Sequence, residues 1–141
     1  MRYRFASLED AEQLAQMNLQ LIADEGHRNP MGIRQLAERM TQWLQGEYQA
    51  VLFEDDNTPV GYALFKREPE YVYLRQLFVV LERRRQGIAS HALSWLWTNA
   101  WQSVPRLRID VLVGNEAGRA FWRSSGFTEY CITMEASAPA V

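Results

Sequence analysis

The feature that most constrains the fold is a predicted strand, a basic turn and a helix that follow one another without a break. Residues 71–80 are rich in β-branched and aromatic side chains, which predicts a strand that ends at the charged cluster 82–85. Apolar residues then recur at helical spacing from Ile88 onward. Residues 107–113 alternate apolar and polar side chains, which is typical of a strand. This order predicts a crossover between two parallel, neighbouring strands.

The residues before this unit predict two helices and a hairpin. A short strand-like segment at the start precedes apolar residues at helical spacing over residues 8–25. A second amphipathic stripe begins at Ile33 and ends near Gly46. Two β-like runs, 49–53 and 59–65, flank a turn-rich segment, and this arrangement predicts an antiparallel hairpin.

After the crossover the pattern predicts three further segments. We expect a short helix at 116–124, a last strand at 127–135 with Tyr130, Ile132 and Met134 on one face, and a disordered tail at 136–141.

Length and composition favour one soluble domain over residues 1–141. A chain of 141 residues with 48% hydrophobic residues is long enough for one real core and short for two. No apolar run approaches the roughly 18 residues of a membrane span, and the polar start does not resemble a signal region, so we expect a cytoplasmic protein. A single cysteine and two distant histidines predict neither a disulfide scaffold nor a metal site.

Charge is distributed unevenly along the chain. The net charge of −2 argues against a nucleic-acid partner. Residues 1–70 contain twelve Asp and Glu against seven Lys and Arg, whereas residues 71–141 contain five against eight. The second half therefore suits an anionic ligand, although a chance split over solvated surface explains the same numbers.

The basic turn has the properties of an anion site. A strand that runs through a glycine-containing turn into a helix presents unpaired N–H groups and the positive end of a helix dipole. Gly87 lets the backbone approach a phosphate, small Ala89 keeps the approach open, and Arg84 can add charge-assisted bonds of roughly 1.5–3 kcal/mol each. A solvated arginine cluster at a helix start is the alternative. The motifs of nucleoside-triphosphate and dinucleotide sites are absent, which disfavours a kinase or a dehydrogenase.

The turn resembles motif A of the GNAT acetyltransferase family, [QR]-x-x-G-x-[GA], with Arg84, Gly87 and Ala89 at the defined positions. Residues 115–127 are similar to the second signature of that family: an Asn, a short helix with an aromatic pair, and a closing Gly-Phe. The order of the expected elements also agrees over roughly residues 3–135.

The resemblance implies an α+β (α/β three-layer) GNAT fold. Its mixed central sheet would have six to seven strands with helices on both faces, and strands 4 and 5 would be parallel and splayed. The resemblance also implies acetyl-CoA as the acyl donor. The residues that it assigns to cofactor binding are Phe78, Val79, Val80, Arg84, Arg85, Gln86, Gly87, Ile88, Ala89, Ser90, Asn115, Phe121 and Trp122.

The catalytic residues are less well defined. Trp122 occupies the position of the tyrosine that often protonates the departing thiolate in this family, and an indole N–H is not an acid in this pH range. Tyr130 is our candidate for the acid, with Cys131 as an alternative. Arg75 and Gln76 stand where the family often has a carboxylate, so the base is left open between Glu68, Glu70 and a water chain.

The resemblance implies an acetyl-CoA-dependent N-acetyltransferase that acts on a primary amine of a small molecule or peptide by direct attack in a ternary complex. The acidic first half favours a cationic amine, whereas Arg75 favours an acceptor with a carboxylate, and the two clues conflict. The alternative is a non-catalytic acyl-CoA-binding regulatory module with the same fold. We expect no membrane partner and leave a homodimer open.

Overall fold

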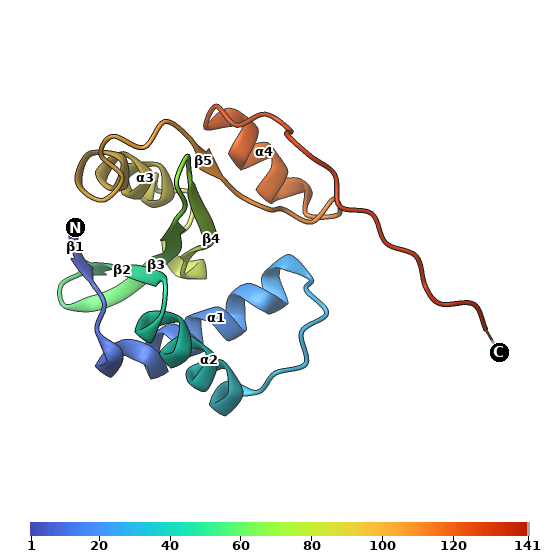
Figure 1. Ribbon diagram of the computed structural model, residues 1–141. Coiled ribbons are helices and arrows are strands. Elements are labelled where there is room, and N and C mark those ends of the chain that lie inside the picture. Colours follow the sequence, from blue (N-terminus) through green and yellow to red (C-terminus); the bar gives the residue numbers. More distant parts are fainter. Residues whose placement is uncertain (141) are drawn as a thin grey trace.

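Five strands form one mixed sheet in the order β1-β2-β3-β4-β5 (Figure 1). The structure, a computed structural model, describes residues 1–140. The strands are β1 (Arg2–Phe5), β2 (Tyr48–Asp55), β3 (Thr58–Arg67), β4 (Val72–Val79) and β5 (Leu107–Arg108). The helices are α1 (Ala11–Glu25), α2 (Ile33–Gln45), α3 (Ile88–Asn99) and α4 (Glu116–Ser124), with short 3-10 turns η1 (Leu8–Asp10) and η2 (Leu81–Arg83).

The helices lie on both faces of the sheet, as predicted. Helices α1 and α2 cover one face, and α3 and α4 lie on the other (Figure 1). Strand β2 shows why the sequence produces this layering: Val51 and Phe53 pack in the α3 layer, whereas the intervening Ala50 and Leu52 pack in the α1–α2 layer. A strand buried on both faces is apolar almost throughout, which is the pattern of β2 and β3.

Most predicted elements are confirmed. The two N-terminal helices, the hairpin of β2 and β3, the strand and helix around the basic turn, and α4 lie close to their expected bounds. The crossover is also confirmed, because β4 pairs with β5 in parallel at Val72–Leu107 and Tyr73–Arg108. None of the helices within residues 1–140 is long and apolar enough to cross a membrane.

The C-terminal strands are where the structure differs from the prediction. Strand β5 spans two residues rather than 107–113, and residues 127–135 form no strand, so the described chain has five strands instead of six to seven. A strand needs a neighbouring edge for its backbone hydrogen bonds, and the two-residue β5 offers almost none. Residues 128–140 therefore run away from the body (Figure 1). The disorder predicted for 136–141 stays a prediction, since residues 136–140 carry no regular structure and Val141 lies outside the described residues.

Candidate functional site

Strand β4 is hydrogen-bonded to β3 along its whole length but to β5 only at its first two residues. We call residues 74–79, on the side that faces away from β3, the open edge of β4. Beyond Tyr73 the chain after β5 diverges, and the Tyr73 hydroxyl spans the separation by donating a hydrogen bond to Asp110 Oδ2 at 2.8 Å. Unpaired backbone N–H and C=O groups along an edge can pair with an extended ligand.

The basic turn follows directly from this edge. Arg85 and Gly87 both adopt left-handed backbone conformations, with φ of 61° and 77°. A non-glycine residue with positive φ is uncommon and clusters at functional sites. The first intrahelical bond of α3 runs from His91 N to Gly87 O at 3.0 Å, so the preceding amides have no partner within the helix. Residues 85–87 are exposed, and their amides lie at the helix N-terminus, an arrangement that is able to bind an anion.

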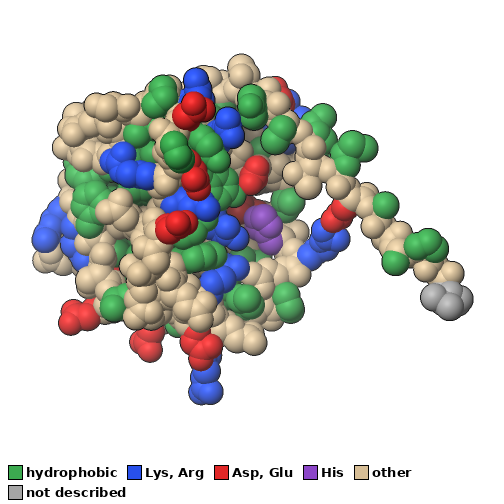
Figure 2. All heavy atoms as spheres, viewed as in Figure 1, with side chains coloured by type: hydrophobic (Ala, Val, Ile, Leu, Met, Phe, Trp, Pro, Cys, Tyr) green, Lys and Arg blue, Asp and Glu red, His purple; other side chains and the backbone are tan. Residues whose placement is uncertain are grey.

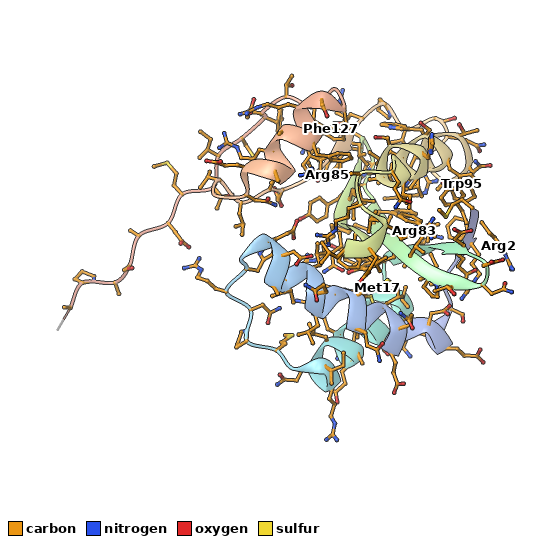
Figure 3. The ribbon with its side chains drawn as sticks, turned by 180° about the vertical axis from the view of Figure 1, so that it is seen from behind. Arg2, Met17, Arg83, Arg85, Trp95 and Phe127 are labelled. Carbon is orange, nitrogen blue, oxygen red and sulfur yellow. The ribbon has the colours of Figure 1, made fainter. Side chains whose placement is uncertain are left out.

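The three consecutive arginines of the turn have different surroundings. Arg83 pairs with Asp55 at 2.8 Å, and Arg84 pairs with Asp24 at 2.5 Å while its Nε donates to Val79 O at 2.8 Å. No ion pair of Arg85 occurs within residues 1–140. Figure 3 shows Arg85 on the side of α4 and Phe127, away from Arg83. Arg85, rather than the expected Arg84, therefore has the side chain that is free to meet an anion.

Helix α4 brings the second signature toward the α3 layer of the core. The Asn115 side chain caps the helix by accepting a hydrogen bond from Gly118 N at 3.0 Å, and a Cβ at Gly118 would lie 2.5 Å from that side chain. The Trp122 ring makes edge contacts with Phe121 and Phe127, with ring centroids 4.9 and 5.0 Å apart. Trp122 is thus a packing residue at the inner side of α4.

On the opposite face of the sheet, polar groups gather beside β4. The buried Tyr62 hydroxyl donates to Gln76 Oε1 at 2.7 Å. Glu25, the last residue of α1, contacts His27 Nε2 at 3.0 Å. Burial raises the pKa of Glu25, against the opposing effect of His27. Burial, and then the charge of Glu25, raises the pKa of Tyr62.

A cluster of arginine and aromatic side chains lies further back along β4. The guanidinium of Arg39 on α2 lies 4.3 Å from the Trp43 ring centroid, and that of Arg75 on β4 lies 4.7 Å from it. Arg75 also donates to the Tyr48 hydroxyl at 3.3 Å, and Arg39 donates to Asn18 Oδ1 at 3.0 Å.

On the face shown in Figure 2, the surface is hollowed between α1 and α4, and basic and acidic side chains gather around the hollow.

The family of the chain follows from a match to a protein-family model. The model of the acetyltransferase (GNAT) family matches residues 16–127, a span that includes the open edge, the basic turn and α4. The chain belongs to the GNAT acetyltransferase family. The predicted GNAT resemblance and α+β fold are confirmed. Acetyl transfer with acetyl-CoA as the donor is the chemistry of this family, and the open edge followed by an amide-lined basic turn fits a long ligand that ends in phosphates.

Solved structures agree on the GNAT fold. A single-residue mutant of the BH1408 protein from Bacillus halodurans superposes with a TM-score of 0.82 at 22% identity, covering 99% of this chain and 100% of that one. A predicted acetyltransferase from Clostridium acetobutylicum, solved with acetyl-CoA, gives 0.76 at 19% identity, covering 96% and 95%. The aminoglycoside N-acetyltransferase AAC(6')-Iy, solved with CoA, gives 0.77 at 14% identity, covering 99% and 95%. No curated protein matches the sequence.

The residues predicted from the sequence fall into two groups in the GNAT fold. The structure brings the end of β4, the basic turn and the start of α3 together as one continuous surface, with Phe78 and Ile88 buried and the turn exposed. Tyr130, the predicted acid, lies apart: it is 77% exposed, and the Arg108 guanidinium lies 4.6 Å from its ring centroid. Cys131 is exposed, Glu68 pairs with Lys66 at 3.2 Å, and Glu70 lies 3.9 Å from Arg106.

Other residues of the site were not predicted. In the sequence, Glu25 ends the first predicted helix, Tyr62 belongs to a predicted strand and Arg39 lies within the second predicted helix, and none of them has a predicted role. One signal was available in the sequence: Glu25 precedes Gly26, a residue type that often ends a helix and does so here in a left-handed conformation, and functional side chains are disproportionately common where a connecting segment begins. The proximity of Arg39 to Arg75 depends on how α2 packs, so no local pattern reveals it.

Proposed function

We propose that the protein is an acetyl-CoA-dependent N-acetyltransferase that transfers an acetyl group to a primary amine of a small molecule or peptide by direct attack in a ternary complex. The observation that supports this proposal most strongly is the continuity of the open edge of β4 with the basic turn. Together they provide, in sequence order, backbone groups for an extended amide-containing arm and a cradle for a pyrophosphate.

In this proposal the donor is held by backbone more than by side chains. The end of the open edge and the residue that follows it, Phe78–Val80, pair with the pantetheine arm. The amides of residues 85–90 hold the pyrophosphate, with Arg85 adding charge. The side chain of Arg84 instead fixes the turn to α1 through Asp24. Asn115, Phe121 and Trp122 support the other side of the arm through the cap and packing of α4. Bound in this way, the donor supplies an activated acetyl thioester.

The chain must also make the acceptor amine neutral. For an alkylamine with a pKa near 10.4, deprotonation at pH 7 costs roughly 4.6 kcal/mol. Glu25 is the proposed base, since its partial burial and raised pKa favour proton uptake, and His27 beside it provides a second proton carrier. The Tyr62–Gln76 pair, in which the charge of Glu25 helps to raise the pKa of Tyr62, is proposed to position the amine or a bridging water.

A dedicated acid is less important for this reaction. A thiol has an ordinary pKa of about 8.5, so a thiolate leaves near neutral pH at modest cost. Tyr130 stays a proposed acid, and its exposed position requires the segment after α4 to move before its hydroxyl could reach the site. Trp122 cannot supply a proton, but the proposed route does not need it to.

Transfer is tested by CoA release from acetyl-CoA over a panel of amines, together with calorimetric titration of CoA. We expect Arg85→Ala to weaken CoA binding about tenfold or more, as loss of charge-assisted bonds does. The matched variant Arg83→Ala should leave binding unchanged, because that side chain pairs with Asp55. Glu25→Gln should lower kcat by about 100-fold or more without affecting CoA binding. The matched control Glu38→Gln, at an exposed position, should change neither kcat nor CoA binding.

A non-catalytic acyl-CoA-binding module is the second candidate, and the packing of Trp122 at the acid position favours it. Tight CoA binding without acetylation of any amine would support it. Appearance of activity in Trp122→Tyr would then show that a missing acid is the cause. If CoA does not bind at all, both candidates fail.

A further inference from the structure

We propose that Arg39 and Arg75, here called the arginine pair, bind a carboxylate of the acceptor, so that the substrate is an amine that also carries a carboxylate: an amino acid or a peptide with a free C-terminus. This inference rests on the proposed transferase function and specifies its substrate class.

The two guanidiniums of the arginine pair share one aromatic partner and have no acidic partner. Both guanidiniums lie against the same Trp43 ring, at 4.3 and 4.7 Å from its centroid. Burial and then the charge of Arg75 lower the pKa of Arg39, so the second cation lies close enough to destabilise the first. No ion pair of either arginine occurs within residues 1–140, although nine other pairs do. An anion would relieve this repulsion.

Unused hydrogen-bond donors lie beside the pair. Arg39 Nε and Asn18 Nδ2 are buried and have no hydrogen-bond partner within the described residues, and the Asn18 side chain is fully buried. Buried polar groups are nearly always paired, so unpaired donors mark a place where an acceptor atom is expected. A carboxylate supplies acceptor atoms in the planar arrangement that guanidinium groups match best.

The position of the pair fits the acceptor rather than the donor. Arg75 precedes the segment 78–80, which begins at the end of the open edge, by three residues, about 10 Å along a strand. The basic turn lies at the other end of that segment, beyond β4. Gln76 follows Arg75 on β4 on the way to the turn, and the end of α1, which carries Glu25, is joined to the turn through the ion pair of Asp24 with Arg84. An acceptor whose carboxylate meets the pair would therefore direct its amine toward Glu25.

This arrangement also reconciles the two clues in the sequence. The acidic first half and the basic Arg75 conflict only if the acceptor has one charge. A zwitterionic acceptor has both, and the structure separates the groups that would recognise them: Glu25 at the end of α1 for the amine, and the arginine pair for the carboxylate.

The first test compares dipeptides that have a free C-terminal carboxylate with the same dipeptides amidated at that end, by CoA release. We expect kcat/KM for the free acids to be about tenfold higher or more, because an amide cannot form the charged contact. Arg75→Gln should raise KM for the acids about 10- to 100-fold and leave KM for acetyl-CoA and for the amides unchanged. Arg75→Lys should restore part of the loss, since it keeps the charge but not the fork.

A structural role for the pair predicts different results. If Arg75 only fixes α2 to the sheet through Trp43, the Arg75→Gln variant will lower the melting temperature and impair acids and amides equally. Either that result or equal turnover of acids and amides in the wild-type enzyme would overturn the proposal. Arg34→Gln, which removes an exposed arginine of α2, is the matched control. It should change neither the KM for the acids nor the KM for the amides.

A protein that transfers no acetyl group can be distinguished from a protein that has no carboxylate site. If CoA binds but no amine is acetylated, the proposed function has failed, and the site is then tested by calorimetry with N-acetylated dipeptide acids and amides on CoA-saturated protein. Binding of the acid that is lost in Arg75→Gln would support the carboxylate site. Equal binding of acid and amide, or no binding of either, would exclude it.

Discussion

The chain up to Trp101 and the chain after it contribute differently to the fold. Every buried residue lies within residues 11–101, and none of residues 102–140 is buried. The first region forms both core layers around β2, β3 and β4, whereas the second adds two paired residues of β5 and the partly buried face of α4. Stability therefore resides in the first region, and the second region can vary around the donor site at little cost to the fold.

Two segments with the same kind of sequence pattern show why the two regions contribute differently to the fold. Residues 72–79 and 127–135 both contain β-branched and aromatic residues suited to a strand. Residues 72–79 form β4 because Gly61–Arg67 of β3 lie beside them, and the buried side chains of Val72, Leu74 and Phe78 pack in the two core layers. Residues 127–135 meet no strand edge, and Ile132 is left 80% exposed. A local pattern thus predicts what a segment is able to form, and its neighbours decide whether it does so.

The largest expected difference in the free energy of unfolding is between glycine substitutions in the two regions. A Cβ at Gly61, on β3, would lie 2.2 Å from Phe78 O and 2.8 Å from the Phe53 ring. Since backbone cannot move aside cheaply at the centre of a sheet, Gly61→Ala should destabilise the protein by about 3 kcal/mol in urea unfolding. Gly114→Ala, in the second region, meets nothing within 4 Å and should stay within about 0.5 kcal/mol of wild type. Equal effects of the two substitutions would contradict the comparison.

Two arginine–carboxylate pairs provide the next contrast. In the first region Asp10 accepts two bonds from Arg4, at 2.9 and 3.0 Å, and one from Ser7 N at 2.8 Å, with little exposure of its side chain. In the second, Glu129 accepts two bonds from Arg123 but is 65% exposed. We expect Asp10→Asn to cost about 1–2 kcal/mol, whereas Glu129→Gln should leave the urea midpoint unchanged because solvent screens that pair.

The stabilisation by the Asp10 carboxylate depends on pH. Arg4 holds the pKa of Asp10 below its ordinary value of 3.8. Stabilisation by the Asp10 carboxylate is thus complete above that value and is lost as the pH falls through the lower, folded-state pKa. The difference in urea midpoint between wild type and Asp10→Asn should shrink over this acidic window. A difference that stays constant down to the lowest pH measured would show that ionisation of Asp10 is not the source of the stabilisation.

The sequence predicted more of the fold than of the site, and the reason is the range of the interactions. The basic turn, Gly87 and the crossover are local, because a strand, a turn and a helix that follow in order must place the turn at a helix N-terminus. The proposed base Glu25 and the arginine pair depend on contacts between α1, α2 and β4, which are remote in sequence. Local periodicity shows which face of a helix is apolar but not which strand residue that face will meet.

Glu25 is an expected exception to the stability of the first region. Burial raises its pKa, so ionisation is less favourable in the folded than in the unfolded state. The contribution of Glu25 to stability is thus fully present below the unfolded pKa and is lost as the pH rises through the folded pKa. Glu25→Gln should therefore raise the urea midpoint slightly at pH 7 while lowering kcat. A midpoint that falls at pH 7 would show instead that the contact with His27 stabilises the fold.

The smallest expected effect is that of removing residues 128–141. The described part of this segment has no hydrogen-bonded neighbour strand. Its ion pairs are exposed: the side chains of Glu135 and Arg28 are 71% and 83% exposed, and those of Glu129 and Arg123 are 65% and 53% exposed. Pairs that exposed contribute little, so the truncated protein should unfold within about 0.5 kcal/mol of the full chain. The urea midpoint should be measured at two protein concentrations. A clear loss of stability would mean that the segment packs on a surface after all, and a loss that grows with protein concentration would show that this surface belongs to a second copy, since only then does association contribute to the stability of the full chain.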